Sequence, residues 1–481
     1  MFHLGLAGYQ PLILYVGAII ACVLSIAWKP QIALYYVVPL LPMQTVRYWL
    51  HAYPLGEKLV DCALLSVLIG VFLHTERPIF AKSSLNKLLI CFFIFTYVSL
   101  WHGAIHLNAP LPYSISDPRF SEWKNFVEMM LFFFVAAAAI RTPKQVAIIV
   151  GLMCLSVLMV NRSYHSTISG RDFSQFSYAL RDAGPLGFAG ENGMAAFQAE
   201  FAIFLIVLAA FVKKWIWRAA IWCVAFTCIY SLLYTLSRGG YLGFLVGLLV
   251  LGLIKERKFL LILFALLLTW QAIVPNAVRE RVFMTYNQGQ GLDSSAQDRV
   301  SIWEDAMQVI QQDPVFGSGF NSYAYMGRVS DYKDTHNYYV KVLLELGAVG
   351  LLLFLAMLGI CWKMTWRLFR NSKDSLLSGL GCATFVMLCT AAIVNFFGDR
   401  WSYLQVNGFL WVLLGLVARS MLLAQHDMAA GESQPESFPE AQPLLRGFRM
   451  RDNLAIPMDR QSKRKDPPSR DSYPKQRTTA F

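Results

Sequence analysis

Apolar residues occur along this chain in long runs of about 16 to 25, and polar residues are gathered mainly in the links between the runs. A membrane-spanning helix needs about 20 mostly apolar residues, and a helix satisfies its own backbone hydrogen bonds in lipid. The pattern predicts an all-α fold, a polytopic transmembrane helical bundle of 12 or 13 spans. The expected spans are 10–27, 31–47, 58–75, 86–103, 124–140, 144–161, 194–212, 216–236, 239–254, 258–275, 338–362, 376–397 and 402–423.

Composition supports a membrane protein. Of the 481 residues, 56% are hydrophobic and only 15% are charged, whereas a soluble domain carries roughly 25% charged residues. The nine cysteines all lie in apolar segments and form no C-x-x-C pair, which argues against a disulfide framework and against a thiolate zinc site.

We interpret the formal charge of +12 mainly as a signal of the chain's orientation in the membrane, because lysine and arginine are concentrated in the cytoplasmic links of membrane proteins. We therefore expect membrane lipids, and not nucleic acid, around this chain. The basic links predicted to be cytoplasmic are 213–218, 255–258 and 363–373. Alternation of the spans then places 104–123, 162–193, the end of 216–236 and the whole of 276–337 on the opposite, outer face.

Two parts of different composition are expected. Residues 1–423 form the transmembrane domain, and residues 424–481 form a cytoplasmic tail that holds seven of the twenty prolines. The tail has almost no apolar periodicity, so it cannot bury enough surface to fold alone. We expect a disordered tail that touches anionic lipid headgroups, with a protein-docking role as the alternative.

The outer link 276–337 is long enough to carry function. Its middle has helical periodicity, with one predicted apolar face made of Val300, Trp303, Met307 and Ile310. Asp313-Pro314 should end this helix, and the glycines of 316–320 predict a flexible turn. Arg299 is expected in the first helical turn, where a cation opposes the macrodipole, so an anionic ligand or a carboxylate should hold it.

Ionisable residues near the outer face are the candidates for chemistry. His336 has an ordinary pKa near 6.5 and can accept a proton at ambient pH, although a structural role is the alternative. Lys341 and Glu345, four residues apart, either satisfy one another or act in function. The tight turn at Arg238 suits either a headgroup anchor or a fork that binds diphosphate.

The link 162–193 adds Arg162, Arg171 and Arg181 to the outer face. Several arginines with few nearby acids suit a polyanionic, lipid-linked substrate. Asp331 and Asp334 are the nearest pair of outer acids, and we interpret them as solvated loop residues. The sequence thus predicts neither a metal site nor a cofactor.

The order of these motifs resembles the O-antigen ligase and polymerase superfamily. The resemblance is best over about 190–365 and covers other parts of the chain only through the number of spans. The motifs that carry it are Ser237-Arg238-Gly239-Gly240, Arg299 with Trp303, Pro314–Phe320, His336-Asn337-Tyr338-Tyr339 and Leu344–Gly350. Each motif is weak alone, and their shared order and sidedness make the resemblance specific.

The resemblance implies an inverting, metal-independent glycosyltransferase at the periplasmic face of a bacterial inner membrane. Its donor would be an undecaprenyl-diphosphate-linked glycan, and its acceptor a hydroxyl of lipid A core, of a growing polysaccharide or of a protein. His336 resembles the family's histidine, the proposed base. Arg238 resembles the arginine that holds the diphosphate, with Arg299 and Arg181 as further arginines of this kind. We expect Asn337 and Glu345 to support the site.

Two other functions share the same hydropathy. A transporter or flippase of envelope glycan precursors would typically show repeat symmetry and ionisable residues deep in several spans. Here the distinctive charges gather at one face, near one large loop. A non-catalytic assembly protein is the third possibility. Only the chemistry of the outer face separates these functions.

Overall fold

The computed structural model describes residues 9–75, 79–255, 257–284, 286–287, 291–292, 294–328 and 334–432. Residues Met1–Gly431 form one compact unit. The last helix continues to Glu432, and the rest of the predicted tail, 433–481, lies outside the described residues.

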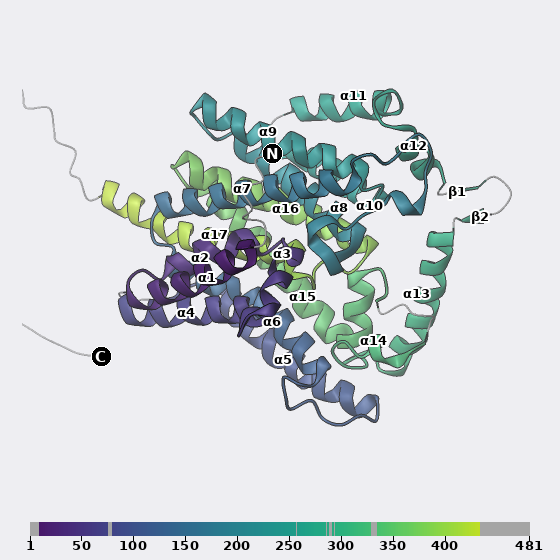
Figure 1. Ribbon diagram of the computed structural model, residues 1–481, viewed down its shortest axis with the longest axis horizontal. Coiled ribbons are helices and arrows are strands. Elements are labelled where there is room, and N and C mark those ends of the chain that lie inside the picture. Colours follow the sequence, from purple (N-terminus) through teal and green to yellow (C-terminus); the bar gives the residue numbers. More distant parts are fainter. Residues whose placement is uncertain are drawn as a thin grey trace, which may run out of the picture. The chain divides into compact units, whose positions relative to one another are not determined.

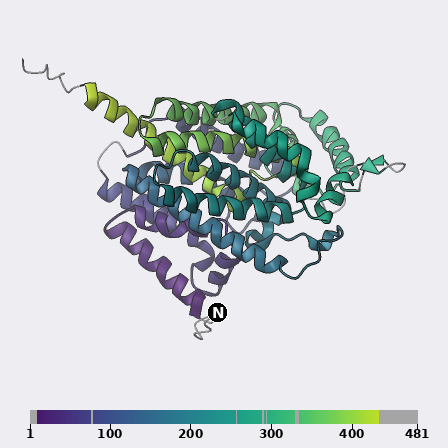
Figure 2. The same cartoon turned by 90° about the horizontal axis from the view of Figure 1, so that it is seen from above.

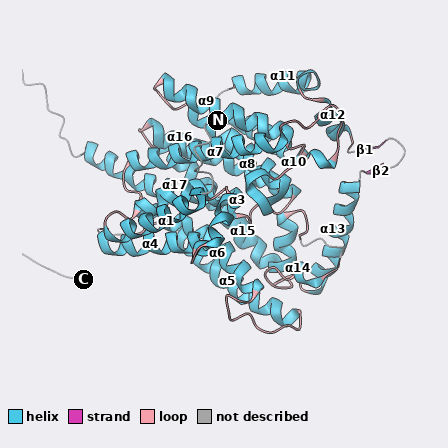
Figure 3. Ribbon diagram, in the orientation of Figure 1, coloured by secondary structure: helices cyan, strands magenta, loops and turns pink. Residues whose placement is uncertain are grey.

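The described chain is built almost entirely of helices (Figures 1 and 3). The α-helices are α1 (Gln10–Ala27), α2 (Gln31–Val37), α3 (Gln44–Tyr48), α4 (Leu59–His74), α5 (Ser84–His106), α6 (Pro118–Ala139), α7 (Pro143–Ile168), α8 (Gly190–Ala209), α9 (Trp215–Tyr234), α10 (Arg238–Ile254), α11 (Lys258–Ile273), α12 (Asn276–Phe283), α13 (Ser294–Gln312), α14 (Tyr323–Met326), α15 (Tyr338–Asn371), α16 (Ser375–Val394) and α17 (Leu404–Glu432). Short 3₁₀ turns are η2 (Val38–Leu40), η3 (Trp49–Ala52), η4 (Gly56–Lys58), η5 (Tyr178–Leu180), η6 (Gly184–Ala189) and η7 (Asn395–Phe397), and β1 (Tyr286–Asn287) pairs antiparallel with β2 (Gly291–Leu292). The predicted all-α, polytopic class is confirmed.

Within the described residues, eight helices are long and apolar enough to cross a membrane, or nine if the bent pair α11 and α12 is one span. The eight are α1, α5, α7, α8 with the preceding η6, α9, α15, α16 with η7, and α17 to Gln425. This number is below the 12 or 13 expected. Several predicted spans became helices of fewer than 18 residues, such as α2 and α10, and α6 carries four charged residues.

Helix α8 lies at the centre of the bundle and packs against α9, α10 and α16. A helix that is apolar on every side is stable only when it is surrounded, and 94% of the span that includes α8 is buried. Its Phe197 and Phe201 contact each other and Phe409 of α17, and Phe201 also contacts Phe204. Figure 2 shows the helices lying side by side around this core.

The two groups of links predicted on opposite faces are each gathered together. At the basic end, the Lys255 ammonium lies 3.0 Å from the centre of the Phe211 ring, and the Ser375 hydroxyl donates to the Phe211 carbonyl. At the other end of α10, the outer links contact one another: Tyr325 donates to Glu122 (2.9 Å), and Phe176 N donates to Glu280 (2.6 Å). The gathering of basic links at one end and of the other links at the opposite end agrees with the distribution of lysine and arginine along the sequence.

Helix α15 is broken at Gly347, where φ is 64° and ψ is −170°. The break leaves backbone groups that the helix itself cannot satisfy, and the segment Pro314–Gly319 pairs with them. The predicted turn is present, since Gly317 N donates to Asp313 O (3.0 Å), and the segment is bonded to α15 on both sides of the break. The bonds run from Ser318 N to Leu344 O (2.9 Å), Gly319 N to Glu345 O (2.8 Å), Ala348 N to Pro314 O (2.9 Å) and Val349 N to Val315 O (3.2 Å).

Replacing Gly347 with alanine should destabilise the protein strongly. A left-handed φ costs a non-glycine residue about 1–3 kcal/mol, and a Cβ here would lie 2.2 Å from the Val315 carbonyl oxygen. The melting temperature in detergent, followed by fluorescence-detected size exclusion, measures the effect. Gly359→Ala in the same helix is the control, because a Cβ there meets no atom within 4 Å; equal melting temperatures of the two variants would contradict the prediction.

Helix α13 ends at Gln312, directly before Asp313-Pro314 as predicted. The predicted buried face is wrong at Trp303 and Met307, which are exposed, and correct at Ile310. The helix has apolar residues on two sides, and docking against the first half of α15 selects one of them. The residues in this contact are Ile302, Ala306, Val309, Ile310, Tyr323 and Leu344.

Candidate functional site

Five segments that are distant in sequence meet at the outer-link end of the bundle. They are the link before α8, the turn between α9 and α10, α12, the residues that lead into α15, and the segment Gly398–Tyr403 between α16 and α17. Hydrogen bonds and ion pairs join them. Because helix ends carry these segments, the ionisable side chains gather at one edge of the bundle.

His336 lies directly before α15 in a left-handed conformation, with φ at 50°. Its backbone N–H donates to the Asp334 carboxylate, and its Nδ1 is 3.3 Å from Asp334 Oδ1. Asn337 then caps α15, because its Oδ1 accepts from the backbone N–H of Tyr339 and Val340. Trp303 of α13 donates to the Thr335 carbonyl (2.9 Å). The backbone on both sides of His336 is thus fixed, and the His336 side chain is 26% exposed.

Burial lowers the pKa of His336, and the positive charges of Arg299 and Arg400 lower it further. The carboxylates of Asp334 and Asp298 oppose this effect without cancelling it. The net pKa is below the ordinary value of about 6.5, so the imidazole is neutral at neutral pH and can accept a proton.

Arg181 and Arg238 lie on either side of one small polar network. The Arg181 guanidinium donates to Asn192 Oδ1 (2.7 Å) and forms an ion pair with Glu191 (3.1 Å). Ser237 Oγ donates to the same Asn192 oxygen (2.8 Å). Arg238 follows as the first residue of α10. The structure therefore brings together two arginines that are 57 positions apart in the chain.

The sequence interpretation missed Arg281 and Arg400, which are 4% and 6% exposed. Arg281 donates to the Tyr178 hydroxyl (3.3 Å) and lies over the Tyr178 ring, and its charge acts on Arg181. Arg400 donates to the Ala189 carbonyl (3.5 Å). A signal for Arg400 was present, because Asp399-Arg400 interrupts an apolar region between two predicted spans.

Arg400 connects the two halves of the site. It is near His336, whose pKa it lowers, and it contacts Ala189 directly before α8. Beside it, a Cβ on Gly239 would lie 2.7 Å from Phe397 of η7, so the start of α10 packs against the same segment. We refer to Arg181, Arg238, Arg281, Arg299 and Arg400 as the arginine cluster.

Arg299 is the sixth residue of α13 and lies in its second turn, so the macrodipole argument for an anionic partner does not hold. Its position beside His336 is the relevant finding. Asp334 is likewise not a solvated loop acid, since it contacts His336 and is 19% exposed. Asp331 lies outside the described residues. In the described part of the chain, no group of three or more His, Cys, Asp or Glu forms a metal site.

Lys341 pairs with Asp399 (Nζ to Oδ2, 2.8 Å), and not with Glu345 as one interpretation of the sequence proposed. Burial opposes the ionised form of Asp399, but the Lys341 ammonium outweighs it and keeps the pKa of Asp399 below its ordinary value. The Glu345 carboxylate instead accepts from Asn321 N (3.0 Å). Glu345 thus holds the backbone at Asn321, shortly after the segment Pro314–Gly319, whereas the Lys341–Asp399 pair holds the segment that carries Arg400.

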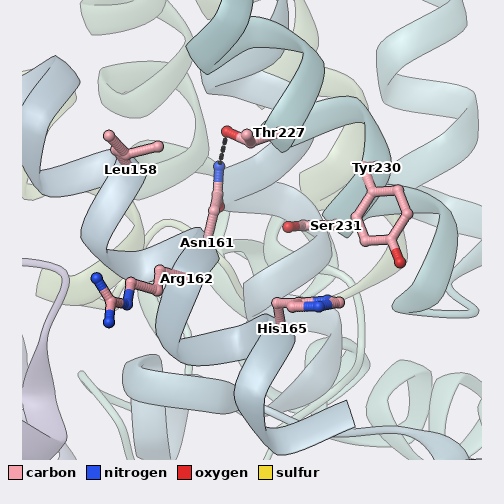
Figure 4. Close-up of a pocket in the computed structure, with 7 residues that line it drawn as sticks. All are labelled: Leu158, Asn161, Arg162, His165, Thr227, Tyr230 and Ser231. Carbon is pink, nitrogen blue, oxygen red and sulfur yellow. Dashed lines mark hydrogen bonds between the residues drawn. The ribbon is translucent and has the colours of Figure 1, made fainter. Parts of the chain in front are cut away.

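A hollow of about 350 Å³ lies between α7 and α9. Figure 4 shows Asn161 pointing toward Thr227, with a hydrogen bond of 2.8 Å, while Arg162 points away from it. The lining surface is almost entirely apolar. Of the outer-face arginines expected from the sequence, Arg162 lines this hollow, whereas Arg181, Arg238, Arg299 and His336 do not. The arginine cluster and His336 are therefore a separate feature.

Part of the chain is similar to a known protein family. Residues 223–355 match the family model of O-antigen ligase, and this segment contains Arg238, Arg281, Arg299 and His336. No curated protein matches the chain. The family match supports glycan transfer of the O-antigen ligase type by a multi-pass membrane protein. The resemblance of this chain to the O-antigen ligase superfamily is therefore confirmed over residues 223–355.

Proposed function

We propose that the protein transfers a glycan, with inversion, from an undecaprenyl-diphosphate-linked donor to an acceptor hydroxyl at the periplasmic face of the inner membrane. The observation that carries the proposal is the meeting of a neutral, aspartate-paired histidine with the arginine cluster at one end of the bundle. The acceptor is lipid A core, a growing polysaccharide or a protein.

His336 is proposed as the base. In the tautomer with the proton on Nδ1, the nitrogen that lies 3.3 Å from Asp334 Oδ1, Nε2 carries the lone pair that takes the acceptor's proton. The acceptor oxygen forms its bond to the anomeric carbon as the bond to the diphosphate oxygen breaks. The diphosphate leaves with the electron pair, and attack from the opposite side inverts the anomeric centre.

The arginine cluster is proposed to bind the diphosphate. Guanidinium groups form bidentate, charge-assisted bonds with phosphate oxygens, and preorganised donors stabilise the charge that develops on the leaving group. Arg238 and Arg299 are the proposed direct ligands. Arg181 is joined through Asn192 to Ser237, directly before Arg238, and Arg400 contacts Ala189 and acts on His336. Because these cations supply the charge, the proposed mechanism does not require a metal.

Reconstitution of the unmodified protein tests the proposal. Liposomes containing the protein receive the lipid-linked donor and each candidate acceptor in buffer with EDTA, and mass spectrometry identifies which acceptor gains mass. We expect one acceptor to gain the glycan. Uptake of solute into sealed vesicles without any transfer would favour the transporter instead.

The pH dependence of kcat/KM should report His336. Its lowered pKa keeps the neutral form present below pH 6.5, so the acidic limb of the profile should lie below that value. Arg400→Gln removes a charge that lowers the pKa and should move the limb to higher pH. Asp334→Asn removes a charge that raises it and should move the limb to lower pH. Identical limbs in all three proteins would exclude His336 as the titrating group.

A further inference from the structure

A second cavity, of about 330 Å³, lies between α3, α4, α6 and the start of α17. Its volume is in the range of about 300–1,000 Å³ that is usual for small-molecule sites. Unlike the hollow between α7 and α9, it has a mainly polar lining. We refer to it as the α4–α6 cavity.

The charges that line the α4–α6 cavity balance one another. The lining has three lysine or arginine residues and three acids, together with the histidine His51: Arg47, Lys58, Lys124, Glu57, Asp61 and Glu128 are the six. The arginine cluster, in contrast, has an excess of positive charge. A balanced lining with amide and hydroxyl groups suits a neutral ligand that both donates and accepts hydrogen bonds, and not a phosphate.

Two buried polar atoms in this lining have unused hydrogen-bonding capacity. Lys124 Nζ contacts Asp61 Oδ1 (2.6 Å) and Glu128 Oε2 (3.0 Å). The other oxygen of Glu128, a residue that is 8% exposed, has no hydrogen-bond partner among the described residues, and neither has Arg47 Nε. An unmatched buried polar atom is costly, and a hydroxyl group can donate to the first and accept from the second.

The cavity adjoins the His336 site through the segment Gly398–Tyr403. Ser402 and Tyr403 line the cavity, and Ser402 N donates to Asp399 Oδ1 (3.1 Å). Asp399 in turn accepts from Lys341 Nζ (2.8 Å) in the first turn of α15, the helix that His336 precedes. A molecule in the cavity would therefore lie against the segment that also contacts the start of α15.

We propose that the α4–α6 cavity binds a sugar ring of a glycan substrate and thereby positions that glycan at His336. Sugar hydroxyls match the balanced polar lining and the unmatched Glu128 and Arg47 atoms, and the Tyr403 ring offers an apolar wall for the face of the sugar. The proposal rests on the proposed function. The sugar belongs either to the acceptor or to the donor, and kinetics distinguish these two sources.

Three substitutions in the reconstituted full-length protein test the proposal. Glu128→Gln keeps the shape of the cavity and changes its hydrogen bonding. Asn125→Trp fills the cavity from an exposed position on α6, so it blocks a ligand without disturbing the core. Glu122→Gln is the matched control, an exposed acid on the same helix that contacts Tyr325 outside the cavity.

The KM for each glycan substrate is measured with the other substrate saturating. We expect the first two variants to raise one KM by about tenfold or more, as the loss of one or two hydrogen bonds or of the binding space does, with a smaller change in kcat. An increase in the acceptor KM assigns the sugar to the acceptor, and an increase in the donor KM assigns it to the donor. Both KM values unchanged in Asn125→Trp would overturn the proposal.

Direct binding separates the failure of this proposal from the failure of the proposed function. Saturation-transfer NMR is run with the free glycans released from the acceptor and from the donor, mixed with the unmodified protein and with Asn125→Trp. Binding that Asn125→Trp abolishes would support the sugar site even if the unmodified protein transferred no glycan. Absence of binding to the unmodified protein, or equal binding to both, would contradict the site whether or not transfer occurs.

Discussion

Replacing His336 with alanine should lower the kcat of glycan transfer by roughly 10²–10⁴-fold, the usual contribution of a general base. The alanine cannot take the acceptor's proton, whereas the arginine cluster can still bind the donor. The KM for donor should therefore change much less than kcat. Initial rates in proteoliposomes at saturating donor measure this effect.

His106→Ala is the matched control, because this exposed histidine is the last residue of α5 and lies in an outer link. It should transfer glycan at the unmodified rate. His336→Ala should also elute and melt like the unmodified protein, since its ring is not part of the buried core. A His336→Ala protein that folds and keeps full activity would remove the base from the proposed mechanism.

Replacing Arg238 with alanine should lower kcat by roughly 10²–10³-fold, as the loss of one preorganised donor to a developing anion does. Arg238→Lys should recover only part of the activity, because an ammonium keeps the charge but cannot form the bidentate fork. Competition by a soluble diphosphate gives a second measurement, since its inhibition should weaken in parallel with the loss of rate.

Arg218→Ala controls for the removal of positive charge, because Arg218 is exposed near the start of α9, at the basic end of the bundle. This variant should be fully active and should bind soluble diphosphate as the unmodified protein does. If Arg238→Ala had the same activity as Arg218→Ala, the diphosphate would have to be bound elsewhere.

Much of the architecture followed from one-dimensional patterns. Apolar run lengths predicted an all-α membrane bundle, since lipid leaves a continuous chain few other ways to satisfy its backbone. The predicted 12 or 13 spans exceed the eight or nine among the described residues, because the ends of α2, α4 and α10 depend on packing and not only on apolar length. Similarly, the buried face of α13 depended on its contact with α15.

Some residues of the candidate site could be identified from the sequence, and others only from the structure. His336, Arg238 and Arg299 stand out in the sequence because isolated charges at the edges of apolar runs are rare and costly. Arg400 and Asp334 gain their significance only from their neighbours in space. The pairing of Lys341 with Asp399, 58 positions away, could not be distinguished in sequence from a pairing with Glu345, because local spacing favours the nearer acid.

The sequence by itself determined the membrane class, the grouping of the basic and outer links, and the family resemblance, because hydropathy and motif order are properties of the linear chain. The tertiary structure decided that Pro314–Gly319 supplies the hydrogen-bond partners for the backbone groups at the break in α15. It also decided that Arg400 contacts Ala189 and acts on His336, and which groups surround the α4–α6 cavity. These features depend on contacts between helix ends that are far apart in sequence, and their energies arise only when the bundle is packed.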